Sequence, residues 1–68
     1  MNKEAINGVT YGITVAKGII GVAIDELEDC ELDDYEQETV KEYLQEGIRR
    51  LNMAYDIVLP RTKEEQHE

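Results

Sequence analysis

Six side chains of this sequence could bind a small anionic ligand. Five of them lie close together near the N-terminus, at spacings that place them near one another on a helix. Those five offer an amide, two hydroxyls, an aromatic ring and an ammonium group. In a nucleotide site the ring stacks on the base, polar groups bind ribose and phosphate, and the cation offsets phosphate charge. The alternative is that the polar groups face solvent while the ring packs at a subunit contact. These candidate ligand-binding residues are Asn7, Thr10, Tyr11, Thr14 and Lys17, with Lys41 as a further cation.

The sequence offers no catalytic or metal-binding constellation. It contains no serine, so a Ser-His-Asp triad is impossible, and the single cysteine, Cys30, has no histidine near it in sequence. We expect Cys30 to be a buried structural thiol. The carboxylates show neither EF-hand spacing nor the Glu-x-x-His pairs of di-iron bundles. The sequence therefore predicts a protein that is not an enzyme, with no metal and no cofactor.

Negative charge is concentrated in the middle of the chain. The whole sequence has 16 acidic and 7 basic residues and a net charge of −9. The segment from Asp25 to Glu46 holds eleven of the acids and one of the bases, which gives it a net charge of −10. Because this charge repels a phosphate backbone, we expect no nucleic-acid partner. We interpret the segment as a solvated acidic tip; an acidic surface that mimics DNA is the alternative.

Two heptad patterns indicate the elements that must position these residues. Apolar residues alternate at spacings of three and four from Ile6 to Cys30, and again from Val40 to Val58. This spacing is typical of the packed seam of a helix. We predict helix 1 over residues 3–29 and helix 2 over residues 34–59.

The helix boundaries favour a hairpin. Asp33 and Glu36 have the spacing of a capping box at the start of helix 2, with Asp34 as an alternative cap. Pro60 is expected to end that helix. The short connection between the helices is typical of antiparallel neighbours. The expected fold is all-α: an antiparallel two-helix hairpin over residues 1–60, followed by a polar, disordered tail over residues 61–68.

Helix 1 has more apolar surface than one partner helix can cover. A second stripe, at Gly8, Gly12, Val15, Ile19 and Val22, lies beside the seam. We therefore expect the hairpin to assemble into an oligomeric helical bundle with helix 1 at its centre. All five glycines fall in predicted helices, where each costs about 1 kcal/mol relative to alanine, and close helix packing is expected to offset that cost. The packing glycines are Gly8, Gly12, Gly18, Gly21 and Gly47.

Length and hydropathy place the chain among small cytoplasmic proteins. A domain of 68 residues is marginal as a monomer. No signal peptide is recognisable, and no uninterrupted apolar run approaches the roughly 20 residues that span a bilayer. We expect a cytoplasmic protein that has no membrane partner.

Two segments resemble the helical-hairpin domain shared by phage anti-CBASS and anti-Thoeris sponge proteins. The first, at the end of helix 1, is Gly21-xxx-Asp25-Glu26-Leu27. The second is Leu44-Gln45-Glu46-Gly47-Ile48, followed by Leu51, Ala54 and Pro60. The similarity covers residues 17–60, mostly at packing positions.

This resemblance implies a non-enzymatic homo-oligomer, often a hexamer, that binds and sequesters a cyclic nucleotide signal. The ligands of the family are cyclic oligonucleotides or cyclic ADP-ribose isomers, and a phage-encoded member acts in the host cytoplasm as a means of immune evasion. Anti-CBASS members carry a base-stacking tyrosine in an N-terminal arm and a lysine in helix 1. Here Tyr11 and Lys17, both inside helix 1, are expected to take these roles.

Two other functions compete with this interpretation. An acidic helical module can bind a host protein through its tip and inhibit or regulate it, which predicts binding that weakens with salt. An RNA-binding hairpin of the plasmid Rop type is the third hypothesis, because the Glu31-Leu32-Asp33 turn and the positions of Lys3 and Lys17 are similar. The net charge of −9 argues against that third hypothesis.

Overall fold

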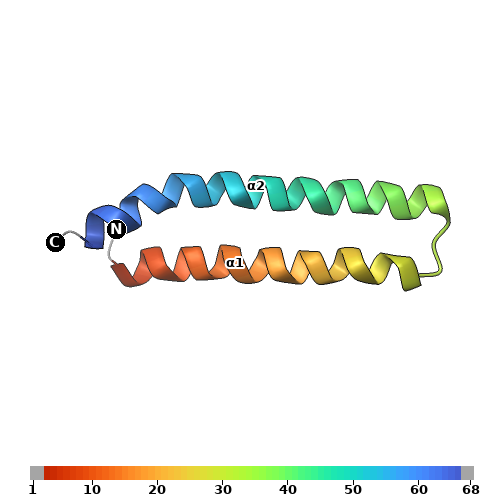
Figure 1. The fold of residues 1–68 in the computed structure, drawn as a ribbon, viewed down its shortest axis with the longest axis horizontal. Coiled ribbons are helices and arrows are strands. Elements are labelled where there is room, and N and C mark those ends of the chain that lie inside the picture. The colour runs from red at the N-terminus through yellow and green to blue at the C-terminus, as the bar shows by residue number, and fades with distance from the viewer. Residues whose placement is uncertain (1–2, 67–68) are drawn as a thin grey trace.

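The fold is a hairpin of two long antiparallel helices. A computed structural model describes residues 3–66, with side chains described for residues 3–61. The elements are α1 (Lys3–Glu26), the 3-10 turn η1 (Leu27–Asp29) and α2 (Asp34–Gln66). The helices run side by side along a rod of 53 × 16 × 13 Å, with the start of α1 and the end of α2 at the same end of the rod (Figure 1). The predicted all-α hairpin is confirmed, and no strand occurs in residues 3–66.

The turn between the helices is fixed by the predicted capping box. The Glu36 amide donates to Asp33 Oδ1 at 2.7 Å, and the Asp33 amide donates to Glu36 Oε1 at 3.1 Å. These bonds satisfy backbone donors that the start of a helix leaves without partners. Gln37 Nε2 also donates to the Leu32 carbonyl at 3.1 Å, which ties the loop to the first turn of α2.

The seam between the helices is narrow, and it differs in part from the predicted heptad. Among residues 3–61, three apolar side chains are buried: Ile6, Ile13 and Leu27. Val9 and Ala23 belong to the pattern of alternating three- and four-residue spacings that begins at Ile6, yet both are exposed, while Ile24 is half-buried. The seven-residue repeat of Ile6, Ile13, Ile20 and Leu27 is buried or half-buried along α1 and into η1. The second row of the seam starts four residues after Ile6 instead of three, so Thr10, Lys17 and Ile24 are its half-buried members.

Two further expectations are corrected by the helix ends. Cys30 follows η1 in an extended conformation and is exposed, so it is not a buried thiol. The second helix continues through Pro60 to Gln66 instead of ending at residue 59. A proline removes one backbone hydrogen bond and bends a helix, and the sequence that follows is rich in Lys, Glu and Gln, which favour helix. Figure 1 shows this last part of α2 bending toward the start of α1. The predicted tail is thus helical over residues 61–66, and residues 67 and 68 lie outside the described residues.

Close packing of α1 against α2 does not account for the glycines. A Cβ added at Gly8, Gly12, Gly18 or Gly21 meets no atom within 4 Å. At Gly47 it would lie 3.7 Å from Ile20 Cδ1, an ordinary van der Waals contact. Within a single hairpin, the cost of the four glycines of α1 is therefore not offset by packing.

The first part of the hairpin contains one long apolar segment. By length and composition alone, the segment Lys3–Asp29 could cross a membrane. An 18-residue window of this segment has a mean hydropathy of 1.2. Only 11% of that window is buried in the hairpin. The core helix of a soluble protein and a signal sequence near the N-terminus meet the same criteria of length and composition.

Candidate functional site

Three of the predicted ligand-binding residues share one exposed side of α1. Asn7, Tyr11 and Thr14 follow one another at spacings of four and three, which places them one above another along the helix. All three are exposed, and the Tyr11 side chain has 72% of its surface free. An aromatic ring this exposed, beside an amide, can stack on a flat ligand without first leaving a packed position.

The two threonine hydroxyls of the site are already engaged as donors. Thr10 Oγ1 donates to the Asn7 carbonyl and Thr14 Oγ1 donates to the Thr10 carbonyl, each at 3.0 Å. Their oxygens keep lone pairs that can accept a hydrogen bond from a base amine or a ribose hydroxyl. Donation to a phosphate then falls to the Asn7 amide and the Lys17 ammonium group.

Thr10 and Lys17 lie on a neighbouring side of α1, closer to α2. Both are half-buried, and they are seven residues apart, so they share a side of the helix. That side borders the seam, as the burial of Ile6 and Ile13 on it indicates. The structure therefore brings the five α1 candidates together as two adjacent rows on one helix.

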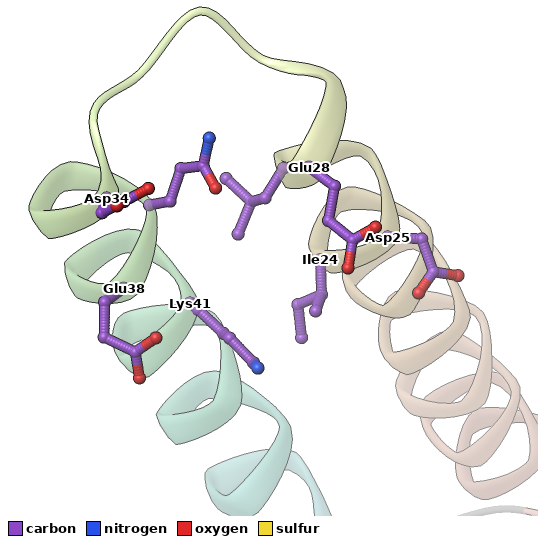
Figure 2. A pocket seen from close by; sticks show the side chains of 8 residues that line it. Ile24, Asp25, Glu28, Asp34, Glu38 and Lys41 are labelled. Atoms are coloured by element: carbon purple, nitrogen blue, oxygen red, sulfur yellow. The ribbon is translucent and has the colours of Figure 1, made fainter.

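Lys41 is not part of that group. Ile20 faces Gly47 across the hairpin; relative to this pair, Lys41 lies toward the tip and Lys17 toward the other end. The two lysines are separated by about 14 Å along the helix axis. Figure 2 shows Lys41 extending from α2 toward α1 near Ile24.

Lys41 lines a pocket at the tip of the hairpin with a volume of about 660 Å³. Its other charged groups are four carboxylates, two from α1 and η1 and two from α2 (Figure 2). Among the described side chains, Lys41 forms no ion pair. A pocket with four carboxylates and one ammonium group repels phosphate, so Lys41 is poorly placed to bind a nucleotide. The pocket is lined by Ile24, Asp25, Leu27, Glu28, Asp34, Gln37, Glu38 and Lys41.

Two arginines of α2, Arg49 and Arg50, pair with the same glutamate. Arg50 Nε donates to Glu46 Oε1 at 3.1 Å, and Arg49 pairs with the other oxygen of the same carboxylate. The Arg50 hydrogen bond, aided by the charge of Arg49, holds the pKa of Glu46 below its ordinary value of 4.5. All three side chains are well hydrated, so this cluster is a surface feature of α2.

Sequence reasoning missed the tip pocket and an exposed apolar set on α2. Tyr43, Met53 and Ile57 have 75%, 62% and 75% of their surfaces free. The pocket depends on which residues of α1 face which residues of α2. A heptad pattern in each helix does not determine how the residues of α1 align with those of α2. The length of the loop between η1 and the capping box determines this register.

Comparisons with known proteins leave the family of the chain open. No protein-family model matches the sequence, and neither curated proteins nor solved structures give a significant match. The resemblance to the phage sponge proteins therefore stays a prediction.

Proposed function

We propose that this chain is a non-enzymatic homo-oligomer that binds and sequesters a cyclic nucleotide second messenger. The proposal joins two supports: the exposed apolar surface of α1, which favours self-assembly, and the row of Asn7, Tyr11 and Thr14 beside it. The resemblance to phage anti-CBASS and anti-Thoeris sponges supplies the ligand class, which is cyclic oligonucleotides or cyclic ADP-ribose isomers. A phage-encoded protein of this kind acts in the cytoplasm of the host.

The observation that carries the proposal is the surface that a single hairpin leaves uncovered. Its accessible surface is 5512 Å², whereas a compact monomer of 7.8 kDa exposes about 4,400 Å². Its radius of gyration is 15.7 Å, against about 11 Å for a compact domain of this length. The surplus of about 1,100 Å² exceeds the roughly 800 Å² that each partner buries in a standard interface. Self-association is the direct way for this chain to complete its core.

Assembly and ligand binding are linked by the position of Tyr11. Tyr11 is the member of the row of Asn7, Tyr11 and Thr14 that lies nearest to the apolar stripe of Gly8, Gly12, Val15, Ile19 and Val22. A second subunit seated on the stripe therefore borders the ring, and a ligand stacked on Tyr11 is enclosed on two sides. Sequestration needs no acid or base; it needs only a low Kd and an abundant protein.

Thermal unfolding with a panel of cyclic dinucleotides, cyclic trinucleotides and cyclic ADP-ribose isomers tests the proposal. A ligand at a hundred times its Kd adds about 2.7 kcal/mol of stability, which raises the Tm of so small a chain by roughly ten degrees or more. The linear nucleotide of the same composition is the matched control and is expected to give a smaller shift. An unchanged Tm with every cyclic nucleotide would contradict the sponge function.

A second candidate function is favoured by the tip pocket. Four carboxylates around one lysine form a negatively charged concave surface that fits a basic segment of a host protein. Binding of this kind weakens as salt is added. Joint replacement of the four carboxylates by their amides (D25N, E28Q, D34N and E38Q) is expected to abolish such binding and to leave nucleotide binding intact. The opposite pattern favours the sponge.

A further inference from the structure

We propose that two copies of the chain dock antiparallel through one face of α1, with Gly8 of each copy opposite Ile19 of the other. The inference rests on the self-association in the proposed function and specifies the surface, the direction and the register of that contact. We call this surface the α1 outer face. It consists of Gly8, Gly12, Val15, Ile19 and Val22.

The α1 outer face has the spacing of a second coiled-coil seam. Its residues follow at intervals of four, three, four and three, which is the alternation that lets one helix pack lengthwise on another. The three large side chains are exposed in the hairpin: Val15 at 39%, Ile19 at 65% and Val22 at 61%. No charged residue belongs to this face. A continuous apolar row of this length is the kind of surface that a helix of a partner covers.

The glycines of this face have a use only when a partner is present. A Cβ at Gly8 or Gly12 would meet nothing within 4 Å in the hairpin. Each glycine costs about 1 kcal/mol of helix stability relative to alanine. A second helix lying on these positions can approach closely, because no side chain stands between the two backbones. Close packing of the two helix backbones then offsets the loss of helix stability that the glycines cause in the isolated hairpin.

The order of small and large residues determines the direction of the contact. The glycines occupy the N-terminal half of the face, and Val15, Ile19 and Val22 occupy the C-terminal half. In an antiparallel pair whose facing residue numbers add to 27, Gly8 meets Ile19 and Gly12 meets Val15. Each layer then combines one small and one large residue, which gives even packing. A parallel pair places glycine on glycine and isoleucine on isoleucine, so one half is empty and the other half is crowded.

Charge favours the same direction. The segment from Asp25 to Glu46, with its net charge of −10, occupies one end of a rod 53 Å long. A parallel pair brings two such tips side by side, whereas an antiparallel pair places them at opposite ends. In the antiparallel pair, the distance between the two acidic tips is several times the screening length of about 8 Å at physiological salt. The dipoles of paired α1 helices also oppose one another in the antiparallel arrangement.

Disulfide trapping between two single-cysteine proteins tests the direction and the register. Both carry Cys30→Ala, because Cys30 is exposed; one adds Gly8→Cys and the other Ile19→Cys. Equal amounts are mixed, equilibrated and oxidised with diamide. We expect the mixed dimer to form at least several times faster than either protein links to itself, because like positions lie about 16 Å apart along the helix axis. Thr14→Cys, on an exposed side of α1 away from this face, is the control and is expected to link slowly.

A substitution that blocks the face gives a second readout. Ile19→Asp is expected to reduce the assembled mass measured by sedimentation. Ile57→Asp changes an isoleucine of similar exposure on α2 and is expected to leave this dimer intact. Circular dichroism of both variants checks that the hairpin is still helical.

The outcomes separate this inference from the proposed function. Faster linking of like positions would overturn the antiparallel register. Equal effects of Ile19→Asp and Ile57→Asp on the assembled mass would overturn the assignment of the contact to the α1 outer face. If the protein still assembles and binds a cyclic nucleotide, neither of these results contradicts the proposed function. Flotation of the protein with phosphatidylcholine vesicles, abolished by Ile19→Asp, would assign the face to lipid and overturn the inference. A chain that is a monomer at every concentration would overturn both.

Discussion

Gly47 of α2 lies directly against Ile20 of α1, and a methyl group at Gly47 would be 3.7 Å from Ile20 Cδ1. This is an ordinary contact distance, so alanine fits at position 47 without displacing its neighbour. Because glycine lowers helix stability by about 1 kcal/mol relative to alanine, Gly47→Ala is expected to stabilise the hairpin by up to about that amount. Urea unfolding monitored by circular dichroism measures the change. A loss of stability would mean that the helices approach more closely than this distance indicates.

The capping box of α2 makes a second prediction. Asp33→Ala removes the acceptor of the 2.7 Å hydrogen bond from the Glu36 amide and is expected to cost about 1 kcal/mol. Asp33→Asn removes the same charge but keeps an acceptor, so it serves as the matched control and is expected to cost much less. Thermal unfolding compares the two variants. Equal losses would attribute the effect to charge at the acidic tip instead of capping.

The Glu46 carboxylate predicts a small pH effect on stability. Its pKa in the folded chain is lowered by the hydrogen bond from Arg50 and by the charge of Arg49. A group with a lowered folded pKa stabilises the fold above its unfolded pKa, and this stabilisation is lost as pH falls through the folded value. Glu46→Gln is therefore expected to destabilise the chain slightly at pH 7 and to match the wild type at pH 3. Unfolding curves at the two pH values check it; an equal difference at both would contradict it.

Ligand affinity is expected to depend on Tyr11 and not on Lys41. Stacking of one base on an aromatic ring contributes about 1–3 kcal/mol, so Tyr11→Ala is expected to raise the Kd of the bound cyclic nucleotide about 5- to 150-fold. The exposure of the ring means that the hairpin itself is little affected. Lys41→Ala removes a cation from the acidic tip and is expected to leave the Kd unchanged. Isothermal titration calorimetry measures both; a larger effect of Lys41→Ala would move the site to the tip pocket.

The sequence determined the local features of this fold more closely than the long-range ones. The hairpin and the pair Asp33 and Glu36 could be predicted because each depends on residues a few positions apart. The seam was predicted less well: Ile6, Ile13 and Leu27 are buried as expected, but the second row begins four residues after Ile6 instead of three. Ile24 is therefore half-buried, whereas Ala23 is exposed. The end of α2 was missed because Pro60 removes one hydrogen bond but does not prevent the helix from continuing.

The candidate site shows the same difference between local and long-range features. Asn7, Tyr11 and Thr14 could be grouped from spacing alone, since all three are on one helix. Lys41 could not be placed, because its neighbours come from the other helix and depend on the register of the hairpin. The carboxylates around it become apparent only when α1 and α2 lie side by side.

Native mass spectrometry of the chain, alone and with the cyclic nucleotide panel, tests self-assembly and ligand binding together. We expect an even multiple of the 7.8 kDa chain mass without ligand. We also expect an additional mass that corresponds to one class of cyclic nucleotide and that is absent with the linear nucleotide. A 7.8 kDa monomer that takes up no cyclic nucleotide at any concentration would contradict the proposed function.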